Sequence, residues 1–163
     1  MPDQETIERA EKDKEQGKSP STQAGEFVRE EIEHVREGKH GARSTQQAIA
    51  IGLSKARRAG VKLPPPKKAS ARTRKNARRA SAAAGTRKRP SKSRSRATTQ
   101  ALKREGRSAA SRSALSKQAR SAARKRSPAS RSAAARKAAR TKGPRARSAA
   151  ARKAARTRAR RKK

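Results

Sequence analysis

The chain has 163 residues and a formal net charge of +37. Hydrophobic residues make up 29% of it, but 35 of them are alanines, so only 13 larger apolar side chains are available for a core. A segment that cannot bury apolar surface cannot offset the entropy that it loses on ordering. We therefore expect a mostly disordered chain, with a small all-α helical hairpin near the N-terminus and a basic low-complexity tail with nascent helices. The absence of cysteine excludes disulfides and thiolate chemistry.

Charge is distributed very unevenly along the chain. Residues 1–37 hold 11 of the 12 acidic groups and six basic groups, a net charge of −5. Residues 38–163 hold the other 43 basic groups and a single acid, Glu105, a net charge of +42. Such a segment repels itself unless counter-anions are supplied, and the acidic front is too small to supply them. This distribution predicts that the partner is a large external polyanion.

The first segment, residues 1–20, is charged and contains few apolar side chains. It is compatible with a short solvated helix from about Gln4 to Gln16, but nothing in it requires a fold, so we interpret it as a flexible acidic leader. It lacks the basic and apolar regions of a secretory signal, and no apolar run in the chain is long enough to span a bilayer. We therefore expect a soluble, cytoplasmic protein without a membrane partner.

Residues 21–63 carry the clearest periodicity, and they predict a helical hairpin. In its first half, apolar residues recur at three- and four-residue spacing, which places them on one face of a helix: Ala24, Phe27, Val28, Ile32 and Val35. Gly38 is well placed to end this helix in the left-handed conformation. The basic loop 39–43 follows, and Pro64, Pro65 and Pro66 close the unit with a stiff extended spacer.

The second helix of the hairpin begins with a capping box, Ser44 followed by Gln47. Gly52 lies on the apolar side and should allow close approach of the two helices. Gly60 is expected just after the helix ends, and Val61 should pack on its last turn. The small core invites self-association, which we expect to occur as a homo-oligomer through four residues of the hairpin: Phe27, Ile32, Ile49 and Leu53.

Residues 64–163 form a tail of Ala, Arg, Lys and Ser in which one repeat is exact. The sequence RSAAARKAART occupies residues 131–141 and recurs at 147–157, and prolines at 90, 128 and 144 divide the tail. Ala and Arg are strong helix formers, but charge repulsion and the lack of a packing partner oppose helix formation. We therefore expect a tail that is mostly coil alone and gains helix when it binds DNA.

The tail's chemistry is directed at phosphate. The guanidinium group of Arg offers donors in a planar fork that matches phosphate oxygens. Because duplex DNA carries about one charge per 1.7 Å, a net charge of +42 matches roughly 70 Å of duplex, about 20 base pairs. Flexible repetitive segments do not present side chains to base edges in a fixed geometry, so binding should be salt-dependent and nearly blind to sequence. The expected nucleic-acid contacts are Lys67, Lys68, Arg72, Arg74, Lys75, Arg78, Arg79, Arg87, Lys88, Arg89, Arg120, Arg124, Lys125, Arg126, Arg131, Arg136, Lys137, Arg140, Arg147, Arg152, Lys153, Arg156, Arg158, Arg160 and Arg161.

The acidic residues around the first histidine carry a weaker signal. Three carboxylates and one imidazole lie close together in the sequence, at Glu30, Glu33, His34 and Glu37. We interpret them as a solvated helix face, because no further ligand follows downstream. His40 is interpreted as a loop residue. With about forty foldable residues and no pocket to be expected, we predict that the chain is not an enzyme and has no cofactor or metal site.

Two resemblances extend this interpretation. Residues 67–163, with their RSAAARKAART copies, resemble the tails of linker-histone-like bacterial nucleoid proteins, although they prefer Arg to Lys. That resemblance implies DNA condensation without sequence preference. Residues 26–61, with their QAIAIGLSKARRAG segment, resemble a short uncharacterised bacterial helical family, which implies a bacterial source.

Together these observations favour a nucleoid-associated protein that binds and compacts DNA without sequence specificity. The alternative is a protein that binds RNA nonspecifically or associates with ribosomes. The scarcity of aromatic residues argues against sequence-selective single-strand binding, but it does not exclude nonspecific RNA binding. Attachment to anionic lipid is disfavoured, because the tail lacks the large apolar residues of an interfacial helix.

Overall fold

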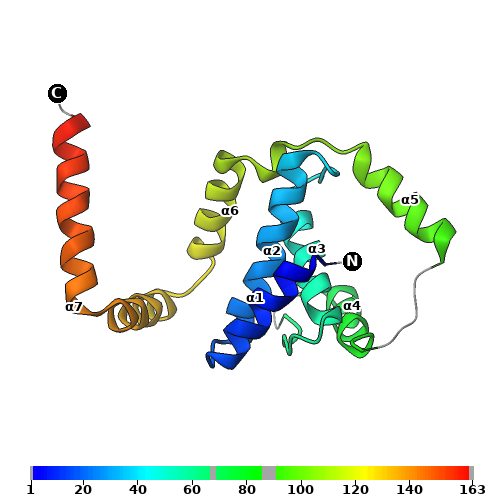
Figure 1. Cartoon of the computed structure of the whole chain (residues 1–163), viewed down its shortest axis with the longest axis horizontal. Coiled ribbons are helices and arrows are strands. Elements are labelled where there is room, and N and C mark those ends of the chain that lie inside the picture. Colours follow the sequence, from blue (N-terminus) through cyan, green and yellow to red (C-terminus); the bar gives the residue numbers. More distant parts are fainter. Residues whose placement is uncertain (1, 67–68, 86–90, 162–163) are drawn as a thin grey trace. The chain divides into compact units, whose positions relative to one another are not determined.

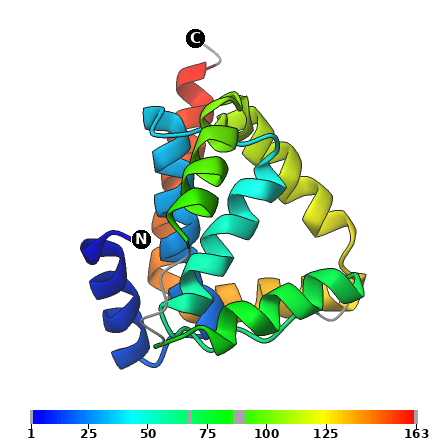
Figure 2. The ribbon, with the colours of Figure 1, turned by 90° about the vertical axis from the view of Figure 1, so that its right-hand side faces the viewer.

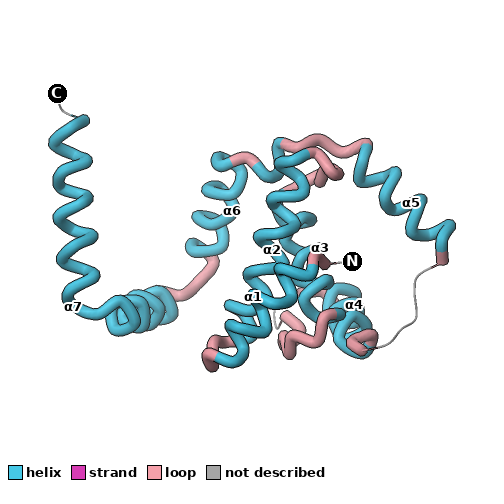
Figure 3. Tube along the Cα trace, in the orientation of Figure 1, coloured by secondary structure: helices cyan, strands magenta, loops and turns pink. Residues whose placement is uncertain are grey.

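The protein is all-α. The computed structural model describes residues 2–66, 69–85 and 91–161, and 77% of the chain is helical. Figure 3 shows helices joined by loops, without a strand in these ranges. The elements, labelled in Figure 1, are α1 (Gln4–Glu15), α2 (Pro20–Glu37), α3 (Thr45–Arg58), α4 (Ala71–Ala82), α5 (Lys92–Lys103), the 3-10 turn η1 (Ser108–Ala110), α6 (Arg112–Arg124) and α7 (Pro128–Arg161). The expectation of a mostly disordered chain is therefore wrong.

Helix α1 is packed, whereas its segment had been interpreted as a flexible leader. It runs from Gln4 to Glu15, close to the short helix that the sequence allows, and it lies against α2 (Figure 2). Thr6 and Ala10 are buried in this contact, together with Asp13. The apolar side chains of α1 are few, but they face a surface that α2 and α3 already provide, so a short stripe is sufficient to dock it.

Helices α2 and α3 form the centre of the fold, and local signals set their ends. Gly38 ends α2 with φ 80°, a conformation that costs glycine little, and the next amide donates to the carbonyl of His34. Ser44 caps α3 by accepting a hydrogen bond from the amide of Gln47 at 3.2 Å. The side chain of Gln47 reaches back to the amide of Arg43 at 2.9 Å, one residue earlier than in a standard capping box.

The two central helices touch at Gly52. A Cβ atom there would lie 2.7 Å from the Cα of Val28 and 2.9 Å from the carbonyl oxygen of Phe27, both on the backbone of α2. Contact this close is possible only for a residue without a side chain. The predicted close approach is confirmed, although α2 and α3 do not form an isolated hairpin.

Two apolar clusters fill the space around α2 and α3. One joins α1, α2, α3 and the segment after α3: Ala10, Ala24, Phe27, Ala56 and Val61, with Ile7, Leu53 and Leu63 partly buried beside them. The other joins α2 and α3 to residues from much later in the chain: Ile32, Val35, Ala42, Ala48, Ala109 and Ala110, with Val28 and Leu115 at its edge. The core thus extends well beyond the predicted hairpin.

Residues 102–118 return to the α2–α3 pair, which composition alone did not predict. The amide of Gly41 donates to the carbonyl of Leu102 at 2.8 Å, and the hydroxyl of Thr45 donates to the carbonyl of Ala109 at 2.6 Å. Arg36 donates from Nε to the carbonyl of Ala110 at 2.9 Å. Alanine is small enough for a backbone turn to pack closely, so this segment of the tail is part of the core.

Helix also replaces the predicted coil in the tail. Ser70 and Ser91 cap α4 and α5 through their hydroxyl groups, and Pro128 begins α7 at a position where its missing N–H costs nothing. The expectation that these segments are coil without DNA is wrong. Local propensity and caps are sufficient to specify helices here, despite the like charges along them.

Contacts divide the chain into two compact units, residues 1–118 and residues 119–163. The first contains α1 to α5, η1 and the start of α6. The second contains the end of α6 and α7, which is two helical segments that meet at Gly143 (φ 67°, ψ 168°) and Pro144. The division of the chain into three functional modules, residues 1–20, 21–63 and 64–163, stays a prediction. Within the described residues, no helix is both long and apolar enough to cross a membrane.

Candidate nucleic-acid interface and buried polar cluster

The predicted nucleic-acid contacts lie on three helices and one turn. Of the residues named above, those at 72–79 lie on α4, those at 120 and 124 on α6, those at 125 and 126 in the following turn, and those at 131–160 on α7. Every one of them is exposed. Lys67, Lys68, Arg87, Lys88 and Arg89 fall outside the described residues, and for Arg161 only the backbone of α7 is described. The predicted residues are therefore spread over separate helices.

The described members of this set have no carboxylate partner. In the described part of the chain, no basic side chain that follows Lys55 forms an ion pair. Many of them instead face a like charge one helical turn away, as Arg136 faces Arg140 and Arg152 faces Arg156 on α7. Each such pair destabilises a helix by about 0.2–0.5 kcal/mol, a cost that a bound polyanion would remove.

The exact repeat corresponds to a structural repeat within α7. The first copy lies before the bend at Gly143 and the second lies after it. In both copies the threonine hydroxyl donates to the carbonyl four residues earlier at 3.0 Å, Thr141 to Lys137 and Thr157 to Lys153. Basic residues occur around the whole circumference of both segments, and only a few small residues are partly buried. Each copy is thus a short, exposed basic helix.

An arginine cleft that sequence reasoning missed lies beside η1. Arg36, Arg107 and Arg112 line an open hollow together with Ala110 and Ser111. None of these three arginines forms an ion pair with a described carboxylate. Only the tertiary fold brings Arg36 next to residues 107–112, so no local pattern could have predicted this cleft.

A second candidate site is a polar cluster inside the folded unit. It is built around Lys55 of α3, whose side chain is 14% exposed. Its Nζ lies 2.7 Å from Oε1 of Glu30 and 2.8 Å from Oε2 of Glu31, two neighbouring carboxylates on α2 that are 3% and 0% exposed. The amide of Asp3 donates to the other oxygen of Glu30 at 3.1 Å, which ties the start of α1 to the cluster.

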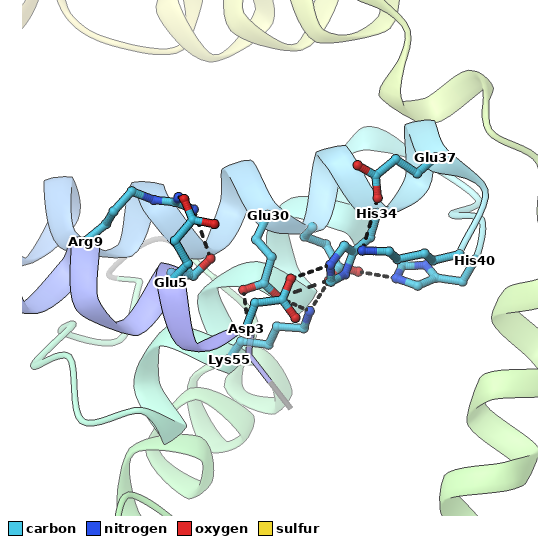
Figure 4. Close-up of polar contacts among 11 residues, drawn as sticks. Asp3, Glu5, Arg9, Glu30, His34, Glu37, His40 and Lys55 are labelled. Atoms are coloured by element: carbon cyan, nitrogen blue, oxygen red, sulfur yellow. Dashed lines mark hydrogen bonds and ion pairs between the residues drawn. The ribbon is translucent and has the colours of Figure 1, made fainter.

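Both histidines of the chain belong to this cluster (Figure 4). His34 Nε2 lies 3.0 Å from Oδ2 of Asp3, and His34 Nδ1 lies 3.9 Å from Oε1 of Glu30. His40 Nε2 lies 3.3 Å from Oε1 of Glu31. The two imidazole rings meet edge to face with centroids 6.2 Å apart. The side chains of His34 and His40 are only 12% and 16% exposed.

Burial and pairing compete in setting the protonation of this cluster. Burial by itself would lower the pKa of Lys55, but its pairing with the carboxylates of Glu30 and Glu31 outweighs burial and raises that pKa above its ordinary value. Burial would likewise raise the pKa of Glu30, but hydrogen bonds from Lys55 and from the amide of Asp3 lower it overall. The hydrogen bond with His34 lowers the pKa of Asp3. The ionised forms of Lys55 and Glu30 are thus favoured although both groups are buried.

The interpretation of Glu30, Glu33, His34 and Glu37 as one solvated helix face is wrong for two of the four. Glu30 and His34 are buried in the cluster, whereas Glu33 pairs with Arg29 at the surface and Glu37 is exposed. Sequence reasoning also missed Asp3, Glu31, Lys55 and the role of His40. The spacing of Glu30, Glu31 and His34 on one helix side was a local signal, but Asp3 and Lys55 join them only through the fold.

The residues predicted to mediate self-association are not equally accessible. Phe27 and Ile32 are 1% and 7% exposed in the core of a single chain. Ile49 and Leu53 are half-buried. Association through this surface stays a prediction, with Ile49 and Leu53 as its accessible members.

Comparison with known proteins adds a match in the front of the chain only. Residues 4–68 match a family of unknown function (DUF6496), a range that contains α1, α2 and α3 and ends before α4. The match agrees with the resemblance of residues 26–61 to an uncharacterised family. No curated protein and no solved structure matches the chain. No match names a histone-like protein. The expected disordered tail is corrected to a set of basic helices, whereas binding of DNA by these helices stays a prediction.

Proposed function

We propose that this chain binds nucleic acid through phosphate contacts made by its basic helices, without reading sequence, and that it thereby draws DNA segments together in the bacterial nucleoid. The observation that carries the proposal is the exposed basic surface of α4, α6 and α7, on which no described basic side chain has a carboxylate partner. Unpaired arginines at this density need a polyanion, and phosphate oxygens match the guanidinium fork.

The helical tail changes how such binding would work. An α-helix is about the width of the major groove, and alanines between the arginines let its backbone approach the duplex. The two copies of the repeat offer equivalent basic helices separated by the bend at Gly143. Two equivalent helices can contact two duplex segments, or two places on one, and multivalent contact of this kind supports compaction.

A salt titration tests the proposal. Affinity for a 20-base-pair duplex is measured against salt concentration for the full chain and for a variant in which Arg147, Arg152, Lys153 and Arg156 are changed to Gln. Losing four phosphate contacts should reduce the log–log salt slope by about 3.6. The matched control changes four exposed basic residues of the front half to Gln: Lys12, Lys14, Arg29 and Lys39. Its slope should equal that of the unaltered chain.

Two results would contradict the proposal. One is an affinity that hardly changes with salt, and the other is an equal slope for both variants. RNA binding is the alternative, and duplex RNA of the same length separates it from DNA binding. Preference for RNA at equal salt, with no DNA condensation in sedimentation, would favour a ribosome- or RNA-associated role.

A further inference from the structure

The polar cluster around Lys55 contains more negative than positive charge. Asp3, Glu30 and Glu31 contribute three carboxylates, and Lys55 contributes one ammonium group. Among the buried groups, two carboxylates thus face one ammonium group. Glu30 and Glu31 are almost completely buried, and buried charge is costly unless it is compensated nearby. The buried part of the cluster is therefore short of one positive charge, whereas the side chain of Asp3 is 56% exposed and solvated.

One group of side chains in the cluster is arranged like a set of metal ligands. One ligand atom each from Glu31, His34 and His40 lies within 4.8 Å of the others. Glu31 is 0% exposed, and neither of its carboxylate oxygens accepts a hydrogen bond of good geometry. Nζ of Lys55 lies 2.8 Å from Oε2 of Glu31, and Nε2 of His40 lies 3.3 Å from Oε1 of Glu31. A buried carboxylate oxygen without a hydrogen-bond donor is available to a cation.

Both imidazoles also have the outer partner that metal-bound histidines usually have. His40 Nδ1 lies 3.1 Å from the carbonyl oxygen of Gly41, and a proton there leaves Nε2, the atom that faces Glu31, as the ligand. His34 Nε2 lies 3.0 Å from the carboxylate of Asp3, and a proton there leaves Nδ1 as the ligand. Such carbonyl and carboxylate partners fix the tautomer and orient the ring toward the metal.

We propose that Glu31, His34 and His40 bind one divalent transition-metal ion, and that Zn²⁺ fits the site best. Two imidazole nitrogens and one carboxylate oxygen suit Zn²⁺, whose tetrahedral site would be completed by water or by Glu30. Its positive charge would compensate the excess of buried carboxylate over ammonium at Glu30, Glu31 and Lys55. With metal–ligand bonds of about 2.0–2.2 Å, the ligand atoms must come to roughly 3.4 Å from one another. The ligand on the loop after α2, His40, is the one placed to make this movement.

Metal binding at this site would hold the loop after α2 in place. The neighbours of His40 in that loop donate hydrogen bonds to the returning segment, Gly41 to Leu102 and Ala42 to Gly106. Fixing the loop should therefore stabilise the docking of residues 102–110 on the front helices. The inference concerns the folded unit and does not depend on nucleic-acid binding by the tail.

The test uses the full chain, freed of metal with a chelator and titrated with ZnCl₂. Because the chain has only two histidines, long-range ¹H–¹⁵N spectra report each imidazole separately. At one equivalent of Zn²⁺, both histidines should show a metal-bound nitrogen, Nδ1 for His34 and Nε2 for His40, and the thermal midpoint should rise. Unchanged imidazole signals and an unchanged midpoint would overturn the proposal.

Variants locate the site. Removing a residue that only orients a metal ligand typically weakens metal binding about 10–100-fold. His40→Ala removes a ligand itself, so it should weaken Zn²⁺ binding by at least about 100-fold. Glu31→Gln should behave similarly, provided that its circular dichroism matches the unaltered chain. The matched control is Glu33→Gln, which removes a carboxylate from the same helix outside the cluster and should bind Zn²⁺ as the unaltered chain does. Full affinity in His40→Ala would place the ion elsewhere and overturn the proposal.

Discussion

Replacing Gly52 by alanine should destabilise the folded unit, although the same change stabilises most helices. The new Cβ would lie 2.7 Å from the Cα of Val28, and ordinary contact begins at 3.4 Å, so α2 and α3 would have to move apart by about 0.7 Å. The atoms in the way belong to the backbone of α2 and cannot rotate aside, which places the overpacking cost at about 3 kcal/mol, near the upper end of its range. The gain in helix propensity is about 1 kcal/mol. The expected net loss is therefore about 2 kcal/mol.

Urea unfolding followed by circular dichroism measures this difference. Gly25→Ala is the matched control, because Gly25 lies inside α2 with nothing within 4 Å of an added Cβ. Propensity alone should then raise the stability of Gly25→Ala by up to about 1 kcal/mol. The two substitutions are chemically identical and should have opposite signs. If Gly52→Ala were as stable as the unaltered chain, the close packing of α2 on α3 would be refuted.

Four further outcomes follow from the structure. Lys55→Met should cost about 3–5 kcal/mol in chemical denaturation, because it leaves two buried carboxylates uncompensated, whereas Lys62→Met at the exposed surface should stay within about 0.5 kcal/mol. The pKa of Glu30 is lowered from 4.5 and that of Lys55 is raised from 10.5, so both groups should stabilise the fold between pH 4.5 and pH 10.5. With chelator present, the contribution of Glu30 should be lost as the pH falls through its lowered pKa, and that of Lys55 as the pH rises through its raised pKa. Thr45→Val should cost about 1–3 kcal/mol, because it leaves a buried carbonyl of η1 without a donor, while Thr98→Val, whose hydroxyl also donates to a carbonyl but is exposed, should cost far less. Circular dichroism of the full chain without nucleic acid should correspond to about three quarters helix, and a coil spectrum would contradict the fold.

Local signals in the sequence predicted the ends of the central helices well. Gly38 requires a left-handed conformation at the end of α2, and Ser44 supplies the acceptor that the first turn of α3 needs. Both effects act within one helical turn, so they can be recognised without a fold. Gly52 also stood on the apolar side of its helix, where only a glycine permits contact between the two backbones.

Composition by itself gives a wrong prediction for the tail. Alanine was discounted as a core residue because it buries little area, yet Ala109 and Ala110 are buried and their carbonyl groups are bound by Thr45 and Arg36. Small residues are valuable where a backbone turn must pack closely, which depends on the surface they meet. A count of large apolar side chains cannot include that effect.

The sequence by itself determined where charge lies, where the central helices begin and end, and that residues 38–163 hold a single acid against 43 basic groups. These properties depend on residue type and on neighbours within a few positions. Only the tertiary structure decided which polar groups meet. Asp3 precedes α1, Glu31 belongs to α2, Lys55 to α3 and His40 to the loop after α2. Their meeting in one cluster with His34 therefore depends on how those elements pack. Burial then turns charges that would be solvated on isolated helices into a cluster that must be neutralised.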